Sequence, residues 1–103
     1  MPQFLIRIEP ARPELLTDST PEEDQIVEAH LAYLQDLVDR DVVLLAGRTL
    51  NTDQASFGIV LLTVPSEASA LEIVNGDPAV SAGIFRAELF PFRVALVSER
   101  LLD

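Results

Sequence analysis

The sequence predicts an α+β protein of the ferredoxin-like type, with the order βαββαβ and two helices covering one face of a four-stranded antiparallel sheet. Three observations support this prediction. Four segments have the composition of strands, two segments between them begin with helix-capping residues, and the longer of these two has a helical apolar period. A length of 103 residues suits a single domain, which we assign to residues 1–103.

The first half of the chain predicts a strand, a loop and a long helix. Residues 3–9 alternate between apolar and more polar side chains, as expected of a strand that buries one face. Residues 10–19 contain two prolines and no regular period, so we expect a loop, either a plain connector or a lid over a site. Thr20 and Glu23 have the spacing of a capping box, and residues 20–40 are therefore predicted to be helical.

The second half predicts three more strands and a short helix. The expected elements are strands at 42–47 and 57–64, a loop between them at 48–56, a helix at 66–75, one helical turn at 77–83 and a last strand at 84–94. Gly76 is expected to end the short helix, and Pro91 favours an edge strand or a bulge. The tail, residues 95–103, either extends the last strand or packs on a partner.

The composition excludes several kinds of chemistry. The chain has no cysteine, and all seven of its basic residues are arginine, so neither a thiolate nucleophile nor a lysine Schiff base is possible. Its single histidine, His30, cannot build a three-histidine zinc site, although a metal held by His30 and carboxylates stays open. Glycine-rich nucleotide-binding motifs are absent. We therefore expect no metal and no cofactor.

The charge and the apolar runs limit the partners. A net charge of −10 without a basic stripe argues against binding to nucleic acid or to an anionic membrane surface. The longest apolar runs are too short to cross a bilayer, and the first residues do not resemble a signal peptide. These features predict a cytoplasmic protein.

A homodimer is expected because the predicted sheet has one uncovered face. Two helices cover only one side of four strands, yet residues 42–47 and 57–64 are apolar at nearly every position. No further segment of the chain is left to cover the second face. A second copy packing sheet against sheet would bury it.

Two residues are candidates for a catalytic pair. His30 lies on the apolar stripe of the long helix, four residues after Ile26 and four before Leu34. In the predicted topology the two helices are antiparallel, and His30 and Asp77 both fall about 15 Å from a common level at a helical rise of about 1.5 Å per residue. Packed helices lie about 8–10 Å apart, so the side chains can meet. Asp77 precedes Pro78 and also fits a simple helix cap, and both interpretations remain open.

Three segments of the chain resemble the YCII-related (YciI-like) proteins. These are "AHLAYLQDLVDRDVVLLAGRTL" (29–50), "FGIVLLTVPSEASALEIVNGDPAVSAGIF" (57–85) and "FPFRV" (90–94), which occur in the family's order. The resemblance implies a ferredoxin-like protomer of the dimeric α+β barrel group, in agreement with the expected homodimer. It also implies an active site with a His–Asp pair, at His30 and Asp77, without naming a reaction.

The chain departs from this family at two positions. Many relatives carry an arginine three residues before the histidine, where this sequence has Val27, and a proline after the glycine of the second strand, where it has Arg48. A cation could therefore have moved from the helix to the mouth of the pocket. The identity of a relative's substrate does not carry over.

The function predicted from these residues is acid–base catalysis on a small organic molecule, such as an elimination, isomerisation or tautomerisation. His30 would act as general base or acid, with Asp77 fixing its tautomer. Possible substrate-binding residues, each with a purely structural alternative, are Arg48, Gly47, Tyr33 and Gly83. The alternative function is a non-catalytic dimeric module that binds a small ligand or serves assembly. An open pocket beside the His–Asp pair favours the enzyme, and a pocket filled by the protein's own side chains favours the module.

Overall fold

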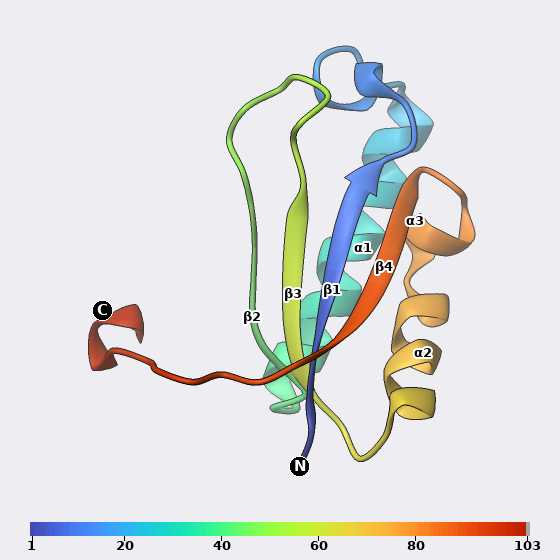
Figure 1. Ribbon diagram of the computed structural model, residues 1–103. Helices are drawn as coiled ribbons and strands as arrows, with labels where there is room; N and C mark the ends of the chain where they lie inside the picture. Colours follow the sequence, from blue (N-terminus) through green and yellow to red (C-terminus); the bar gives the residue numbers. More distant parts are fainter. Residues whose placement is uncertain (103) are drawn as a thin grey trace.

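The computed structural model describes residues 1–102 and confirms the predicted fold class. Four strands form one antiparallel sheet in the order β2-β3-β1-β4, and the helices pack behind one face of it (Figure 1). The strands are β1 (Gln3–Pro10), β2 (Val43–Arg48), β3 (Gly58–Thr63) and β4 (Phe85–Phe92). The helices are α1 (Pro21–Asp39), α2 (Glu67–Gly76) and α3 (Pro78–Ser81), with 3₁₀ turns η1 (Pro13–Leu16) and η2 (Glu99–Leu102).

The long helix begins and ends with recognisable caps. The Thr20 side chain accepts from the Glu23 backbone amide, and the Glu23 side chain accepts from the Thr20 amide, so the predicted capping box is present. At the other end Asp41 adopts φ 60°, and the amides of Asp41 and Val42 donate to Val38 and Leu37. This is a Schellman motif with aspartate at the position that glycine usually holds.

The core lies between the helices and one face of the sheet. Phe4, Ile6 and Ile8 alternate along β1 and are buried, whereas Arg7 on the other face is exposed. The antiparallel register pairs Phe4 with Leu62 and Ile6 with Val60, so these side chains share the covered face. Further buried residues of this core are Leu34, Leu37, Val43, Val64, Ala70 and Val74.

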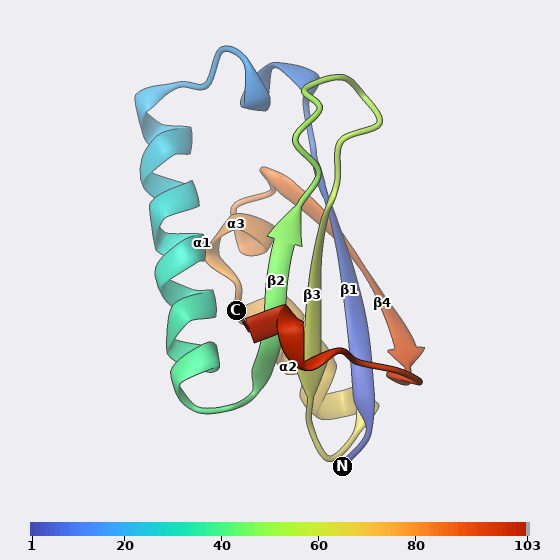
Figure 2. The same ribbon diagram turned by 90° about the vertical axis from the view of Figure 1, so that its left-hand side faces the viewer.

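The other face of the sheet has no helix over it (Figure 2). The register places Leu5 beside Leu61 and Phe90 on this face, and Phe92 beside Gln3. Phe90 and Phe92 are each 42% exposed. β4 is an edge strand, as Pro91 predicted. None of the helices within residues 1–102 is long and apolar enough to span a membrane.

The C-terminal tail leaves the body of the domain. After β4 it runs across the strands, and η2 ends up beyond the edge strand β2 in both views (Figures 1 and 2). Its apolar side chains face solvent, with Leu96 92% and Val97 71% exposed. Up to Leu102, the tail therefore does not extend β4 but projects away from it.

Two details differ from the sequence prediction. Within the predicted loop 10–19, residues Pro13–Leu16 form the 3₁₀ turn η1 and Leu15 is buried, because its side chain anchors the segment to the domain. Gly76 is the last residue of α2 rather than a left-handed stop after it. Its lack of a side chain is explained by packing, since a Cβ there would lie 2.7 Å from the Tyr33 hydroxyl.

Candidate active site

The single histidine and the aspartate after α2 form a buried hydrogen-bonded pair. His30 Nδ1 lies 2.6 Å from Asp77 Oδ2, and the two residues are 7% and 4% exposed. His30 comes from the middle of α1, and Asp77 comes from the junction between α2 and α3. The antiparallel packing of the helices brings these elements together, as the spacing in the sequence indicated.

Asp77 caps a helix and binds the imidazole at the same time. Its Oδ1 accepts from the Ala79 backbone amide at 2.9 Å, which makes it the N-cap of α3. Its Oδ2 is left for His30. Asp77 is therefore both a helix cap and the hydrogen-bond partner of His30, because each carboxylate oxygen serves a different partner.

The other ring nitrogen of His30, Nε2, makes no hydrogen bond within residues 1–102. Among these residues, no fully buried side-chain nitrogen or oxygen lacks a hydrogen-bond partner. Nε2 therefore retains access to solvent. The ring is also held in place by Phe85, whose centroid lies 5.0 Å away in an edge-to-face contact at 82°.

A cavity of about 380 Å³ opens beside His30, between α1 and the sheet. This volume is within the range of small-molecule sites. Its walls come from the sheet, from α1, from η1 after β1 and from the end of the loop that precedes β3. The apolar lining residues are Ile8, Pro10, Leu16, Val27, Leu31, Leu34, Ala46, Phe57, Ile59, Val60 and Phe85, with Gly47 and Gly58.

The polar side chains of this cavity are few. Among the described residues that line it, only His30, Arg48 and Ser56 carry polar groups, and none is acidic. This is unusual for a chain of net charge −10. The cavity therefore favours a largely apolar molecule that carries an anionic or electron-rich oxygen.

The family of the chain follows from its sequence. The model of the YCII-related domain matches residues 4–93. This chain is a YCII-related protein. No curated protein sequence matches it.

Two solved structures resemble the YCII-related chain in fold. The first is "5-chloro-2-hydroxyhydroquinone dehydrochlorinase (TftG)" from Burkholderia phenoliruptrix AC1100, in complex with 2,5-dihydroxybenzoquinone. It has 24% sequence identity and a TM-score of 0.68, over 88% of this chain and 93% of that one. The second is the uncharacterised protein TM1266 from Thermotoga maritima, with 8% identity, a TM-score of 0.53, and coverage of 89% and 96%. At these identities the likeness concerns the fold alone.

Of the four candidate substrate-binding residues of this YCII-related chain, two line the cavity and two do not. Gly47 and Arg48 line the cavity, as does Val27 on α1, so both positions where the sequence departs from many relatives face the same space. Tyr33 and Gly83 are not among the lining residues.

Tyr33 and Gly83 have structural roles outside the cavity. The Tyr33 hydroxyl donates to the Ile73 carbonyl at 2.8 Å and thereby joins α1 to α2. Burial and the negative charge of Asp77 raise the pKa of Tyr33. Gly83 adopts φ +78° in the turn after α3, a conformation that side chains rarely tolerate.

Two cavity residues were not predicted as ligand contacts from the sequence. Ser56 is only 4% exposed, yet it lines the cavity. Gly58 lies in the middle of an apolar run, and a Cβ there would meet Gly47 O at 3.2 Å and Arg48 Cβ at 3.8 Å. A glycine inside a strand is the sequence signal that could have indicated close approach of a ligand or of backbone.

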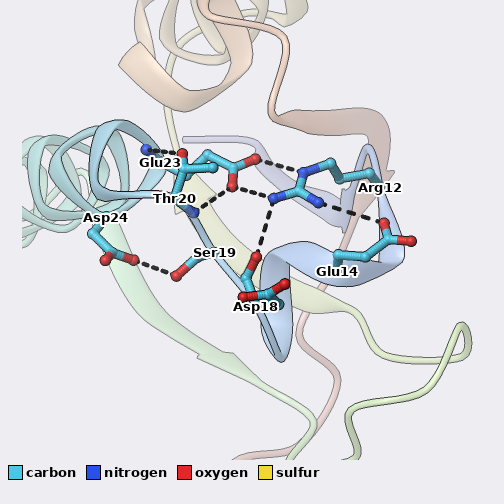
Figure 3. Close-up of polar contacts among 7 residues, drawn as sticks. All are labelled: Arg12, Glu14, Asp18, Ser19, Thr20, Glu23 and Asp24. Carbon is cyan, nitrogen blue, oxygen red and sulfur yellow. Dashed lines mark hydrogen bonds and ion pairs between the residues drawn. The ribbon is translucent and has the colours of Figure 1, made fainter.

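The segment after β1 is fastened to the start of α1 by polar contacts (Figure 3). Arg12 Nε donates to Glu23 Oε2 at 2.8 Å, and its Nη2 donates to Glu23 Oε1 and to the Asp18 carbonyl. These contacts tie the segment containing η1 to the start of α1. Leu16 of η1 lines the cavity, so this segment contributes to the cavity wall.

The same contacts make Glu23 an unusually strong acid. Hydrogen bonds from Arg12 and from the Thr20 amide lower the pKa of Glu23 from 4.5 to about 2. The pair is therefore charged throughout the neutral range.

Within the described residues, no group of three or more His, Cys, Asp or Glu side chains is placed to bind a metal ion.

Proposed function

We propose that this protein is an acid–base enzyme that moves a proton on a small, largely apolar substrate bearing an ionisable oxygen. The observation that carries the proposal is that one imidazole nitrogen is bound to a buried carboxylate while the other belongs to a residue lining an open cavity.

Asp77 and His30 have distinct roles in this proposal. Asp77 accepts from Nδ1–H and so holds the proton of the neutral imidazole on that nitrogen. Nε2 then carries the lone pair and takes a proton from a substrate O–H or C–H group. The imidazolium that forms is stabilised by the Asp77 carboxylate at 2.6 Å.

The electron pair released by the proton moves into the substrate. In a tautomerisation or isomerisation, the imidazolium returns its proton to another atom of the same molecule, and atoms balance without a co-reactant. In an elimination, the electron pair expels a leaving group as an anion, and the proton is passed on to solvent. Arg48 supplies a positive charge for the oxyanion that develops in either case. No covalent enzyme intermediate is required.

The neighbour TftG suggests the compounds to test first. That protein is a dehydrochlorinase of 5-chloro-2-hydroxyhydroquinone, and 2,5-dihydroxybenzoquinone is bound in its structure. Both are small rings with ionisable hydroxyl groups, which matches the size and charge of the cavity. A sphere of 380 Å³ is about 9 Å across, wide enough for one such ring.

The test is turnover of chlorinated and unchlorinated hydroxyquinols and phenols, followed by chloride release and by loss of the starting compound. We expect conversion of at least one compound, and His30→Ala should lower kcat about 10²–10⁴-fold. Glu28→Ala, which changes an exposed residue of the same helix, is the matched control. Turnover that survives His30→Ala, or a panel without any conversion by the wild type, would contradict the proposal.

We further propose that the protein works as a homodimer through the open face of the sheet. Leu5, Leu61, Phe90 and Phe92 lie on this face, and the tail carries the exposed residue Leu96. A second copy would cover the face and receive the tail, in which Leu96 is 92% exposed. Each copy of the chain has both an uncovered apolar sheet face and an exposed apolar tail, so two copies can cover these surfaces for each other.

Light scattering coupled to size-exclusion chromatography tests the dimer. The wild type should have twice the monomer mass of 11.3 kDa at micromolar concentration. Phe90→Glu should give monomers, whereas Leu71→Glu on α2 should stay dimeric, although the two residues are similarly exposed at 42% and 45%. A monomeric wild type would contradict the assembly but not the acid–base chemistry.

A further inference from the structure

A third polar side chain faces the cavity, and the proposed reaction does not use it. Ser56 lies at the end of the loop between β2 and β3, and only 4% of it is exposed. It nevertheless lines the cavity beside apolar residues such as Phe57. A buried hydroxyl is costly unless it has hydrogen-bond partners, so the bonds that Ser56 makes indicate its role.

The hydrogen bonds of Ser56 leave its own proton available. Thr49 Oγ1 donates to Ser56 Oγ at 3.3 Å, and the Phe57 amide in turn donates to Thr49 Oγ1 at 3.1 Å. A serine hydroxyl has one donor and two acceptor positions. Within residues 1–102, Ser56 Oγ uses an acceptor position with Thr49 and has no acceptor for its proton. The chain of donors polarises this O–H group.

Arg48 and Ser56 come from the two arms of one hairpin. Arg48 pairs with Gly58 in the register of β2 and β3, and the next pair is closed by the bond from the Thr49 amide to the Phe57 carbonyl at 2.9 Å. Both arms contribute to the same cavity wall. Arg48 and Ser56 therefore lie on neighbouring segments and line the same cavity.

Gly58, which also lines the cavity, lies close to Arg48. A Cβ at this position would lie 3.8 Å from Arg48 Cβ and 4.0 Å from Ile8 Cβ, both of which line the cavity. Any larger side chain would occupy the space next to Arg48. The absence of a side chain at Gly58 thus keeps the space beside Arg48 free.

We propose that Ser56, Arg48 and Gly58 form a subsite for an ionised oxygen of the ligand, with the Ser56 hydroxyl as the hydrogen-bond donor. The inference rests on the proposed function, because it places this oxygen in the cavity that His30 faces. Arg48 attracts the charge, and Ser56 fixes the position of the oxygen, since an O–H donor is directional. The ligand class is a planar phenolate or enolate whose reacting group lies toward His30.

This subsite discriminates between ligands. A ring without an oxygen at this end would leave the Ser56 proton unpaired in a buried wall, and an unpaired buried donor is penalised. Sites built around such donors reject analogues that lack the matching group strongly. Ser56 is thus a binding and positioning residue rather than a nucleophile.

Calorimetric titration with 2,5-dihydroxybenzoquinone tests the subsite directly. Ser56→Ala should raise Kd about 10-fold or more, because a hydrogen bond to an ionised oxygen is lost. Ser69→Ala removes a hydroxyl from α2, outside the cavity, and should change Kd less than about twofold. Ser56→Cys keeps the volume and offers only a weak S–H donor, so it should weaken binding as Ser56→Ala does, even if the alanine variant folds poorly.

The outcomes separate this inference from the proposed function. Kd values of the Ser56 variants equal to that of the wild type, or absence of wild-type binding, would overturn the subsite. Because binding is measured without turnover, the roles of His30 and Asp77 are not involved in that result. Failure of the proposed function would instead appear as turnover that persists in His30→Ala.

Discussion

Replacing Asp77 by asparagine separates its two hydrogen bonds. The Ala79 amide is a fixed donor 2.9 Å from Oδ1, so the side-chain amide of the new asparagine must present its oxygen there. Its NH₂ group then points at His30 Nδ1, where the carboxylate oxygen lay at 2.6 Å. Two donors cannot face each other, and the imidazole proton must therefore move from Nδ1 to Nε2.

The stability of this variant should change little. Asparagine caps helices about as well as aspartate, and a charged hydrogen bond is replaced by a neutral one, which costs about 1 kcal/mol. For a domain of this size the expected loss is about 4–8 °C in Tm. Asp77→Ala removes the cap and leaves the buried His30 Nδ1 unpaired, so it should cost about 2–4 kcal/mol.

The catalytic activity of Asp77→Asn should fall much more than its stability. With its proton on Nε2, the neutral imidazole presents a donor to the cavity and no longer a base. The loss in kcat should approach that of His30→Ala, about 10²–10⁴-fold. A variant that is nearly as stable as the wild type would thus be nearly inactive.

Nitrogen NMR of the side chain provides the assay. Because His30 is the only histidine, the two ring nitrogens give one pair of signals without any need for assignment. The neutral wild type should carry its proton on Nδ1, and Asp77→Asn should carry it on Nε2. Identical tautomers in the two proteins would refute the reasoning, as would a wild type protonated on Nε2.

Three further predictions concern stability and titration. Stabilisation by Glu23, whose pKa is lowered to about 2, is present above pH 4.5 and lost as the pH falls toward 2. In a plot of the urea midpoint of unfolding against pH, the fall at acid pH should therefore be shallower for Glu23→Gln than for the wild type. Glu72→Gln should leave it unchanged. Asp41→Gly should raise stability by about 0.5–1 kcal/mol in thermal melts, because φ is 60°. Tyr33, the only tyrosine, should show a raised pKa in an alkaline absorbance titration, and the pKa should fall in Asp77→Asn.

Each of these has an opposing result. If the urea midpoint falls equally at acid pH in the wild type and in Glu23→Gln, the ion pair of Glu23 with Arg12 does not contribute to folding stability. A lower Tm for Asp41→Gly would show that the aspartate side chain makes up for its backbone strain. An equal Tyr33 pKa in the wild type and in Asp77→Asn would contradict an electrostatic effect of Asp77 on Tyr33.

The sequence predicted the elements from local rules, and the helical spacing allowed His30 and Asp77 to meet. The capping box at Thr20 and the apolar period defined α1, and the antiparallel arrangement of α1 and α2 placed His30 level with Asp77. These inferences need only the helical rise and the order of elements. They were accurate to one or two residues at the ends of most elements.

The cavity could not be predicted in the same way. Its walls come from separate parts of the chain, and the open space depends on how α1 tilts against the sheet. Tyr33 illustrates the difficulty: it lies three residues after His30 on the same broad stripe, but its side chain turns toward α2 and bonds to Ile73. Spacing alone does not say which edge of a stripe faces a cavity. Gly58 and Ser56 could be recognised as cavity residues only after the pairing of β2 with β3 had placed them on the same wall as Arg48.

The central claim is that His30 holds Nδ1 against Asp77 and presents Nε2 to a solvent-connected cavity. Acylation by diethyl pyrocarbonate, followed by mass spectrometry, tests it most directly, because the chain has one histidine and neither lysine nor cysteine to compete. The folded protein should gain an adduct at His30, and 2,5-dihydroxybenzoquinone should slow that reaction. A His30 that stays unmodified in the folded protein and reacts only after unfolding would contradict the account.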